Sequence, residues 1–439
     1  MPIRDVLVTL IVVGSLPVCF ARPWIGVLMW SWIGYMNPHK LTWGFAYGMP
    51  FAYMVAIATL AGIPFAKDRK PIPWTRETYA LAALWLVYTL STFAAMYPDA
   101  AWPQWEKVSK ILLFTFITLM FFQDRERLRW LFLVIALSIG FYGLKGGVWS
   151  ILKGGVHAVY GPAGSFLGSN NSVGLALNMT LPFLFYLQKD ETRRWLRLLL
   201  RVTFWFSIVA ILFTYSRGAF LALPVVLGLI FLKGRKNVLL GLLSIVVVLM
   251  LFMTFGEYMP GKWWERMATI QTYEEDNSAR NRLEAWTVAT NVALENPLLG
   301  GGFWVLANKA TYAKYGYDAG RSAHSIYFAV LGDHGFIALG LFLFLLYGSL
   351  WSLYRLRWTA GRQPWGAWVN GPALTLEAAF VAYAIAGAFL TEAYFDLFYH
   401  MVSSVVILKV LARREAGAVA RETVPTRRPL RRPAQAPGT

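Results

Sequence analysis

Apolar runs long enough to cross a lipid bilayer recur along the whole chain, separated by short polar loops. Residues 128–151, 326–354 and 373–390 are clear examples. A crossing requires about 20 mostly apolar residues in an α-helix, because unsatisfied backbone groups cannot remain in lipid. Hydrophobic residues make up 57% of the sequence and charged residues only 15%, which excludes a string of soluble domains. We therefore predict an all-α polytopic membrane protein.

Basic residues gather in the short loops between these runs. If the loops alternate between the two sides of the membrane, those on one side contain Lys67, Arg125, Arg193, Lys233 and Arg355, and the C-terminal end on that side is basic as well. Cytoplasmic loops of membrane proteins carry such an excess of Lys and Arg, so we place these loops in the cytoplasm. The net charge of +18 then reflects topology and attraction to anionic membrane lipids, and we predict no nucleic-acid partner.

The same alternation predicts about 12 transmembrane helices with both ends in the cytoplasm, if residues 6–36 cross once. If that stretch crosses twice, there are about 13 crossings and the N-terminus lies outside. Residues 1–255 hold the first group of helices, residues 256–323 form one large, partly helical loop on the far side, and residues 324–412 hold the last helices. Residues 413–439 are rich in Arg, Pro and Ala, which predicts a disordered basic tail.

Arg217 ends an apolar run just before the chain turns into the next one. A charge so close to the bilayer is costly unless it is paired. The side chain either reaches the phosphates of ordinary lipids or binds a specific lipid-linked phosphate. The planar guanidinium group favours the second interpretation, because it binds phosphate oxygens with two parallel hydrogen bonds.

The large loop contains three further arginines that are candidates for holding an anion. Arg280 and Arg282 precede a predicted helix over residues 283–294, whose apolar residues share one face. Basic side chains and free N–H groups at a helix start can hold an anion. The alternative is a solvated face paired with the acidic run at residues 274–276. Arg266 follows two tryptophans, so an interfacial anchor and a ligand are equally consistent with its position.

His324 lies directly before the long apolar run that begins at Ile326. Neutral imidazole is a suitable general base near neutral pH, and the arginines on the same side of the membrane favour a chemical role. His334 is ten positions further along, about 15 Å in an α-helix, so one helix cannot bring both to the same atom. We interpret His334 and the adjacent Asp333 as a structural pair.

The sequence contains no P-loop, no dinucleotide-binding glycine motif and no HExxH motif. A transfer reaction would therefore draw its energy from a pre-activated substrate or a gradient, and no cofactor is predicted. The carboxylates at residues 274–276 have no histidine nearby, so we predict no metal site.

Five motifs together resemble the O-antigen ligase/polymerase superfamily. They are Ser216-Arg217-Gly218, Arg282-x-x-x-Trp286, Glu295-Asn296-Pro297-Leu298-Leu299-Gly300, Ala323-His324-Ser325-x-Tyr327 and Gly332-x-x-Gly335. The N-terminal half, through residues 37–44, is similar to the branch of exosortase-system-associated O-glycosylation ligases. One departure concerns Ser325, where many relatives have Asn.

This resemblance implies a metal-independent, inverting glycosyltransferase of the GT-C type in the bacterial inner membrane, with its active site and large loop facing the periplasm. Its donor would be a glycan on undecaprenyl diphosphate. The acceptor would be lipid A-core for a ligase, another lipid-linked glycan for a polymerase, or an exported protein for the exosortase-associated branch. Carried onto this chain, His324 would activate the acceptor hydroxyl. The diphosphate would be held by Arg217, by Arg280 or Arg282, and by Arg266.

A transporter of lipid-linked glycans remains the alternative from a different class. It would also need arginines for the diphosphate. Secondary transporters more often show internal symmetry and helices broken near the midplane, and this sequence shows neither.

Overall fold

The computed structural model describes residues 3–234, 261, 277–318 and 320–422, and within these ranges the chain is helical with no strand. The α-helices are α1 (Ile3–Ala21), α2 (Pro23–Met36), α3 (Phe51–Gly62), α4 (Arg76–Phe93), α5 (Pro98–Phe121), α6 (Arg125–Leu152), α7 (Asn170–Asp190), α8 (Arg194–Leu212), α9 (Arg217–Gly234), α12 (Asn277–Glu295), α13 (Lys309–Lys314), α14 (Ile326–Thr359), α15 (Asn370–Gly387) and α16 (Asp396–Glu422). Short 3₁₀ helices connect some of them: η1 (Pro38–Leu41), η2 (Phe45–Gly48), η3 (Ile63–Phe65), η5 (Val305–Ala307) and η6 (Pro364–Val369).

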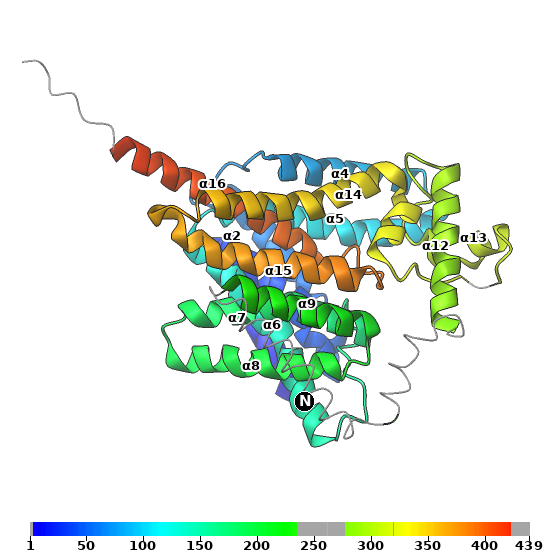
Figure 1. Ribbon diagram of the computed structural model, residues 1–439, viewed down its shortest axis with the longest axis horizontal. Helices are drawn as coiled ribbons and strands as arrows, with labels where there is room; N and C mark the ends of the chain where they lie inside the picture. The colour runs from blue at the N-terminus through cyan, green and yellow to red at the C-terminus, as the bar shows by residue number, and fades with distance from the viewer. Residues whose placement is uncertain (1–2, 235–260, 262–276, 319, 423–439) are drawn as a thin grey trace, which may run out of the picture.

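The long helices run side by side as one bundle, in which α14 packs on α4 and α15, and α15 packs on α7 and α9 (Figure 1). α12 lies across one end of this bundle, with α13 beside it, and packs on α14. The far end of α16 projects from the opposite end. The large loop is therefore partly helical, and its helix α12 covers the ends of the bundle helices.

α12 begins earlier than the sequence predicted, at Asn277, and it buries the predicted face. Ala285, Ala289, Val292 and Ala293 are fully buried on that face, while Thr287 on the other side is exposed. A helix with one apolar stripe gains most of its stability from burying that stripe, so α12 is held against the bundle end.

Five of the described helical segments are long and apolar enough to cross a membrane: Ile3–Ala21, Arg125–Leu152, Arg194–Leu212, Ile326–Thr359 and Pro364–Gly387. α8 also exposes large apolar side chains, among them Trp195, Leu198 and Trp205, along its outer face. An extended apolar surface of this kind is typical of contact with a membrane. The chain is thus a helical membrane protein, and the total number of crossings stays a prediction because residues 235–260 lie outside the described part.

The first two helices form a hairpin, so residues 6–36 are not one continuous helix, and the number of times they cross the membrane stays a prediction. Near the beginning of α1, Asp5 accepts a hydrogen bond of 2.9 Å from the N–H of Ala46, just before α3. Gly26, at the beginning of α2, packs on Thr59 near the end of α3. α1 therefore runs parallel to α3 and α2 runs antiparallel to both. The chain reverses at Pro23, because proline lacks the N–H that a continuous helix would need there.

The C-terminal end is more ordered than the sequence predicted. α16 continues as a helix to Glu422, so the expected disorder does not begin at residue 413. Glu415 on this helix pairs with Arg125 and accepts a hydrogen bond of 2.7 Å from Trp368 Nε1. These contacts hold the helix against its neighbours beyond the apolar part. Residues 423–439 lie outside the described part.

Candidate functional site

The end of α15 and the loop behind it contact two predicted site residues, His324 and Arg282, and the neighbour of a third, Arg217. Thr391 Oγ1 accepts a hydrogen bond of 2.8 Å from the backbone N–H of His324. The ring centroid of Phe389 lies 6.0 Å from the guanidinium carbon of Arg282. Phe389 also packs against Gly218, the neighbour of Arg217, where an added Cβ would lie 3.2 Å from the Cβ of Phe389. The beginnings of α9, α12 and α14 therefore converge on residues 389–391.

His324 has a constrained backbone and a partly buried ring. Its φ angle of 45° lies in the left-handed region, which is uncommon for a residue with a side chain and often marks a functional site. Its Nε2 lies 3.2 Å from Ser322 Oγ. Burial lowers the pKa of the imidazole below its ordinary value of 6.5, and the positive charge of Arg282 lowers it further. The ring is therefore neutral over a wider pH range, as a proton acceptor must be.

Trp286 explains the spacing of the Arg282-x-x-x-Trp286 motif. Its Nε1 donates a hydrogen bond of 2.8 Å to the carbonyl of Ala323, directly before His324. Its ring also stacks on Phe328 in the first turn of α14, with centroids 4.8 Å apart. Residues four positions apart lie on the same side of a helix. One turn of α12 thus anchors the chain at His324 and presents Arg282 next to it.

Arg217 is partly buried at the first position of α9. The turn before it is tight: Tyr215 has a φ angle of 57°, and its hydroxyl donates a hydrogen bond of 2.8 Å to the carbonyl of Gly155. This turn fixes the start of α9, where the positive end of the helix dipole favours an anion, although the N–H of Ala219 already donates to Ser216 Oγ at 3.3 Å.

The other two predicted arginines are placed differently. Arg280 is exposed at the outer side of α12, and its Nε lies 3.8 Å from Glu284 Oε1. Glu284 also forms an ion pair with Arg321, a residue that sequence reasoning did not single out. An exposed arginine beside a carboxylate that already has a second partner is a weaker candidate for a phosphate ligand than Arg282. Arg266 lies outside the described residues.

His334 is a buried structural residue, although it does not pair with Asp333. Its Nδ1 lies 2.9 Å from Ser91 Oγ, and its ring lies 4.3 Å from the rings of both Tyr88 and Phe303. The Asp333 carboxylate instead accepts a hydrogen bond of 2.8 Å from the hydroxyl of Tyr394. Neighbouring residues on a helix point in different directions, so the two side chains reach different partners.

The glycines of the remaining motifs let two backbones meet. Gly335 has φ 75° and ψ −171°, which interrupts α14 one residue after His334. The segment after α12 packs into this interruption: Gly301 N–H donates to the carbonyl of Gly332 at 2.9 Å, and Phe336 N–H to that of Pro297 at 2.9 Å. A Cβ on Gly300 would lie 2.5 Å from the nitrogen of His334, which no side chain tolerates. These motifs therefore lock the large loop onto α14.

The loop that holds His324 also carries acidic groups that sequence reasoning missed. Glu392 accepts a hydrogen bond of 2.5 Å from Ser172 Oγ. Burial raises the pKa of this carboxyl to about 7, although Ser172 and the charge of Lys107 act against the rise. Further along, Asp396 is buried and lines a pocket of about 280 Å³ that Lys107 and Phe166 also line. The signal in the sequence was a polar break at residues 391–396 between the last two apolar runs.

No group of three His, Cys, Asp or Glu side chains that could hold a metal ion occurs among the described residues. The acidic run at residues 274–276 lies outside them, so metal independence stays a prediction.

Residues 202–343 match the family model described as O-antigen ligase. This part of the chain belongs to the O-antigen ligase family. The O-antigen ligase match begins in α8 and ends within α14, so it contains Arg217, Arg282 and His324 but not Thr391. A second model, described as a family of unknown function (DUF5935), matches residues 3–192, which hold α1 to α7. No curated protein matches the chain. The similarity to the exosortase-associated branch stays a prediction.

Proposed function

We propose that this chain transfers a glycan from undecaprenyl diphosphate to an acceptor hydroxyl, at the end of the bundle covered by α12. The observation that carries the proposal is the convergence of α9, α12 and α14 on Phe389 and Thr391, which brings Arg282 and His324 close to Gly218, the neighbour of Arg217. The family match supports a glycosyltransferase of the ligase or polymerase type.

Arg217 and Arg282 are assigned to the diphosphate. The leaving diphosphate gains negative charge as its bond to the anomeric carbon breaks. Positive groups held in place before the reaction stabilise this charge most in the transition state, and that difference accelerates the reaction. Arg282 supports this assignment because its position is fixed by the Trp286 anchor one turn further along α12.

His324 is assigned to the acceptor. The acceptor oxygen attacks the anomeric carbon and its proton passes to the neutral imidazole. The carbon–oxygen bond to the diphosphate breaks, and its electron pair stays on the phosphate oxygen. One base on the face opposite the leaving group gives direct displacement with inversion. The lowered pKa of His324 supports this role, since the ring must be unprotonated when the acceptor binds.

The membrane orientation is part of the proposal. The loops rich in Lys and Arg lie on the cytoplasmic side of a bacterial inner membrane, and α12 with His324 faces the periplasm. Because α1 and α2 form a hairpin, the parity of the later helices then puts the N-terminus on the periplasmic side. The GT-C class and the number of crossings belong to this proposal as well.

The test is transfer in vitro by the purified chain from a lipid-linked glycan, with lipid A-core, a second lipid-linked glycan and an exported protein offered as competing acceptors. Ligation to lipid A-core or protein supports the ligase, and elongation of the lipid-linked glycan supports a polymerase. EDTA in excess should leave the rate unchanged. Movement of the lipid-linked glycan across a vesicle membrane without transfer would instead support a transporter.

A further inference from the structure

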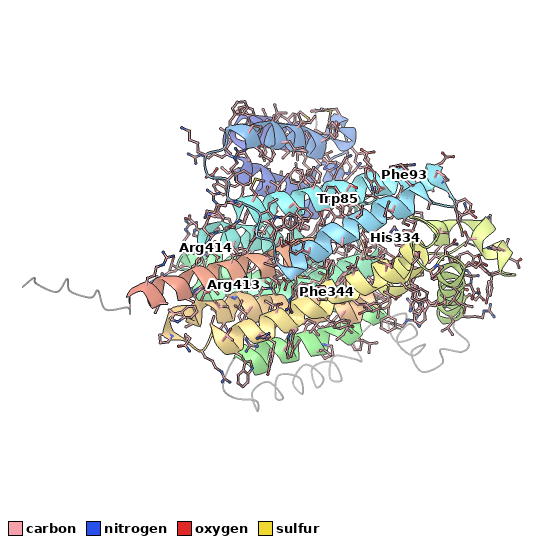
Figure 2. All side chains as sticks on the ribbon, turned by 90° about the horizontal axis from the view of Figure 1, so that it is seen from above. Trp85, Phe93, His334, Phe344, Arg413 and Arg414 are labelled. Carbon is pink, nitrogen blue, oxygen red and sulfur yellow. The ribbon has the colours of Figure 1, made fainter. Side chains whose placement is uncertain are left out.

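A second pocket, of about 870 Å³, lies between α4, α14 and α16 at the end of the bundle away from His324. α14 begins beside His324 and ends at Thr359, which lines this pocket. In Figure 2, Arg413 lies toward one end of the molecule, while His334 and Phe93 lie toward the other. The pocket is therefore separate from the proposed transfer site by the length of the bundle.

Cationic side chains from three helices line this pocket: Arg76 from α4, Arg355 from α14, and Lys409 and Arg413 from α16. Lys409 is compensated, because its Nζ lies 2.7 Å from both carboxylate oxygens of Glu77. Arg76, Arg355 and Arg413 are exposed and form no ion pair within the described part of the chain. With respect to the described residues, the pocket therefore presents to a ligand three positive charges that have no ion-pair partner.

Aromatic residues border the same pocket. Trp74 and Tyr79 lie against each other with ring centroids 5.0 Å apart, and both are exposed. Trp351 of α14 and Trp365 of η6 also line the pocket. Tryptophan and tyrosine gather where a membrane meets water, since their rings suit the level of the lipid headgroups. This border places the pocket at headgroup depth.

An apolar groove of about 480 Å³ adjoins the pocket at Trp74, which lines both. Ala82, Trp85 and Leu86 of α4 and Phe116 of α5 line the groove. Positions 79, 82 and 86 lie on one face of a helix, so Tyr79 in the pocket continues into Ala82 and Leu86 in the groove. Figure 2 shows Trp85 between Arg413 and Phe93 along the molecule. The groove thus leads from the charged pocket toward the middle of the bundle.

We propose that the pocket and the groove form one binding site for an anionic glycerophospholipid, with the phosphate-bearing headgroup among Arg76, Arg355 and Arg413 and an acyl chain along α4. Basic pockets between transmembrane helices on the cytoplasmic side bind such headgroups. The arginine fork matches phosphate oxygens, and the groove, whose lining is apolar and aromatic apart from Thr89, matches a hydrocarbon chain. The bound lipid would join α4, α14 and α16 at the end of the bundle opposite the transfer site.

The experiment measures lipid binding to the full chain by native mass spectrometry, with phosphatidylglycerol and phosphatidylcholine added separately. The wild type should bind phosphatidylglycerol more tightly. Replacing Arg76, Arg355 and Arg413 with Gln should weaken that binding by roughly fivefold for each arginine removed. Arg194→Gln is the matched control, because Arg194 is exposed at the start of α8 and does not line the pocket. All variants must keep the wild-type melting temperature.

A second variant tests the groove independently. Ala82→Trp fills the space of the acyl chain without changing charge, so it should weaken phosphatidylglycerol binding. Soluble glycerol phosphate has no acyl chain, so neither the wild type nor the variant should bind it measurably. Equal binding of both lipids by the wild type, or unchanged affinity in the triple arginine variant, would overturn the proposal. Displacement of phosphatidylglycerol by equimolar undecaprenyl phosphate would also overturn it, because the occupant would then be a polyprenyl lipid.

Discussion

The backbone N–H of His324 donates a hydrogen bond of 2.8 Å to the hydroxyl of Thr391, across 67 positions of the sequence. This bond joins the residue before α14 to the loop after α15. It holds His324 in a left-handed backbone conformation, which is unfavourable for a residue with a side chain unless surrounding contacts stabilise it. The bond therefore positions the proposed base, and Thr391 acts through His324 rather than on a substrate.

Thr391→Val should lower the turnover number by about tenfold and leave donor affinity unchanged, because it keeps the shape of the side chain but removes the acceptor of the His324 N–H. The measurement is the transfer rate at saturating donor together with donor affinity. Thr375→Val is the control, since the hydroxyl of Thr375 donates within α15, to the carbonyl of Gly371 at 3.0 Å. An equal effect of both variants would show that Thr391 has no positioning role.

His324→Ala should lower turnover by about 10²–10⁴-fold while donor binding is retained, as expected for loss of a general base. His334→Ala should instead lower the melting temperature, because it removes a buried ring packed between Tyr88 and Phe303. Folded His334→Ala protein should keep detectable transfer. Turnover of His324→Ala close to that of the wild type would exclude the histidine as the base.

Arg217→Ala and Arg282→Ala should weaken donor binding as well as turnover, since both would lose charge-assisted bonds to the diphosphate. Arg217→Lys should restore part of the loss, because lysine lacks the bidentate fork. Arg280→Ala should have a smaller effect than Arg282→Ala, since Arg280 is exposed beside Glu284. Donor affinity measured on all four purified variants decides this. A larger loss of donor affinity for Arg280→Ala than for Arg282→Ala would assign the diphosphate contact to Arg280.

The activity of the wild type should fall on the acid side with an apparent pKa below 6.5, because the proposed base is inactive when protonated and its pKa is lowered. Burial is the larger cause and the charge of Arg282 the second. Arg282→Gln removes that charge, so the acid limb should move to higher pH in addition to the loss of donor affinity. The check is a pH profile of turnover at saturating donor, and an unmoved limb would contradict the electrostatic contact.

Because of Glu392, the free energy of unfolding should fall as pH rises from about 4.5 to about 7. Its pKa is raised in the folded state, so the folded chain binds the proton more tightly than the unfolded chain does over that range. The stability is present at low pH and is lost as the carboxyl ionises. Glu392→Gln should flatten the dependence of the melting temperature on pH. A wild-type melting temperature that rises over this range would contradict the assignment.

The sequence by itself determined the helical membrane class, because the length and spacing of apolar runs decide whether a chain can leave water. It also made Arg217, Arg282 and His324 candidates for the site, together with Arg266 and Arg280, since charged groups next to the bilayer are costly and the motifs around them are specific as a set. The apolar face of α12 was readable as well, because helical periodicity fixes which residues share a side.

Only the tertiary structure decided which candidates meet. Arg280 and Arg282 stand two positions apart, yet the packing of α12 turns one toward Glu284 and the other toward Phe389. Phe389, Thr391 and Glu392 carry no local motif, because their roles arise from contacts with residues far away in the chain. The hairpin of α1 and α2 was undecided for the same reason: a proline marks a break in a helix, while the direction in which the chain continues depends on what the next helix packs against.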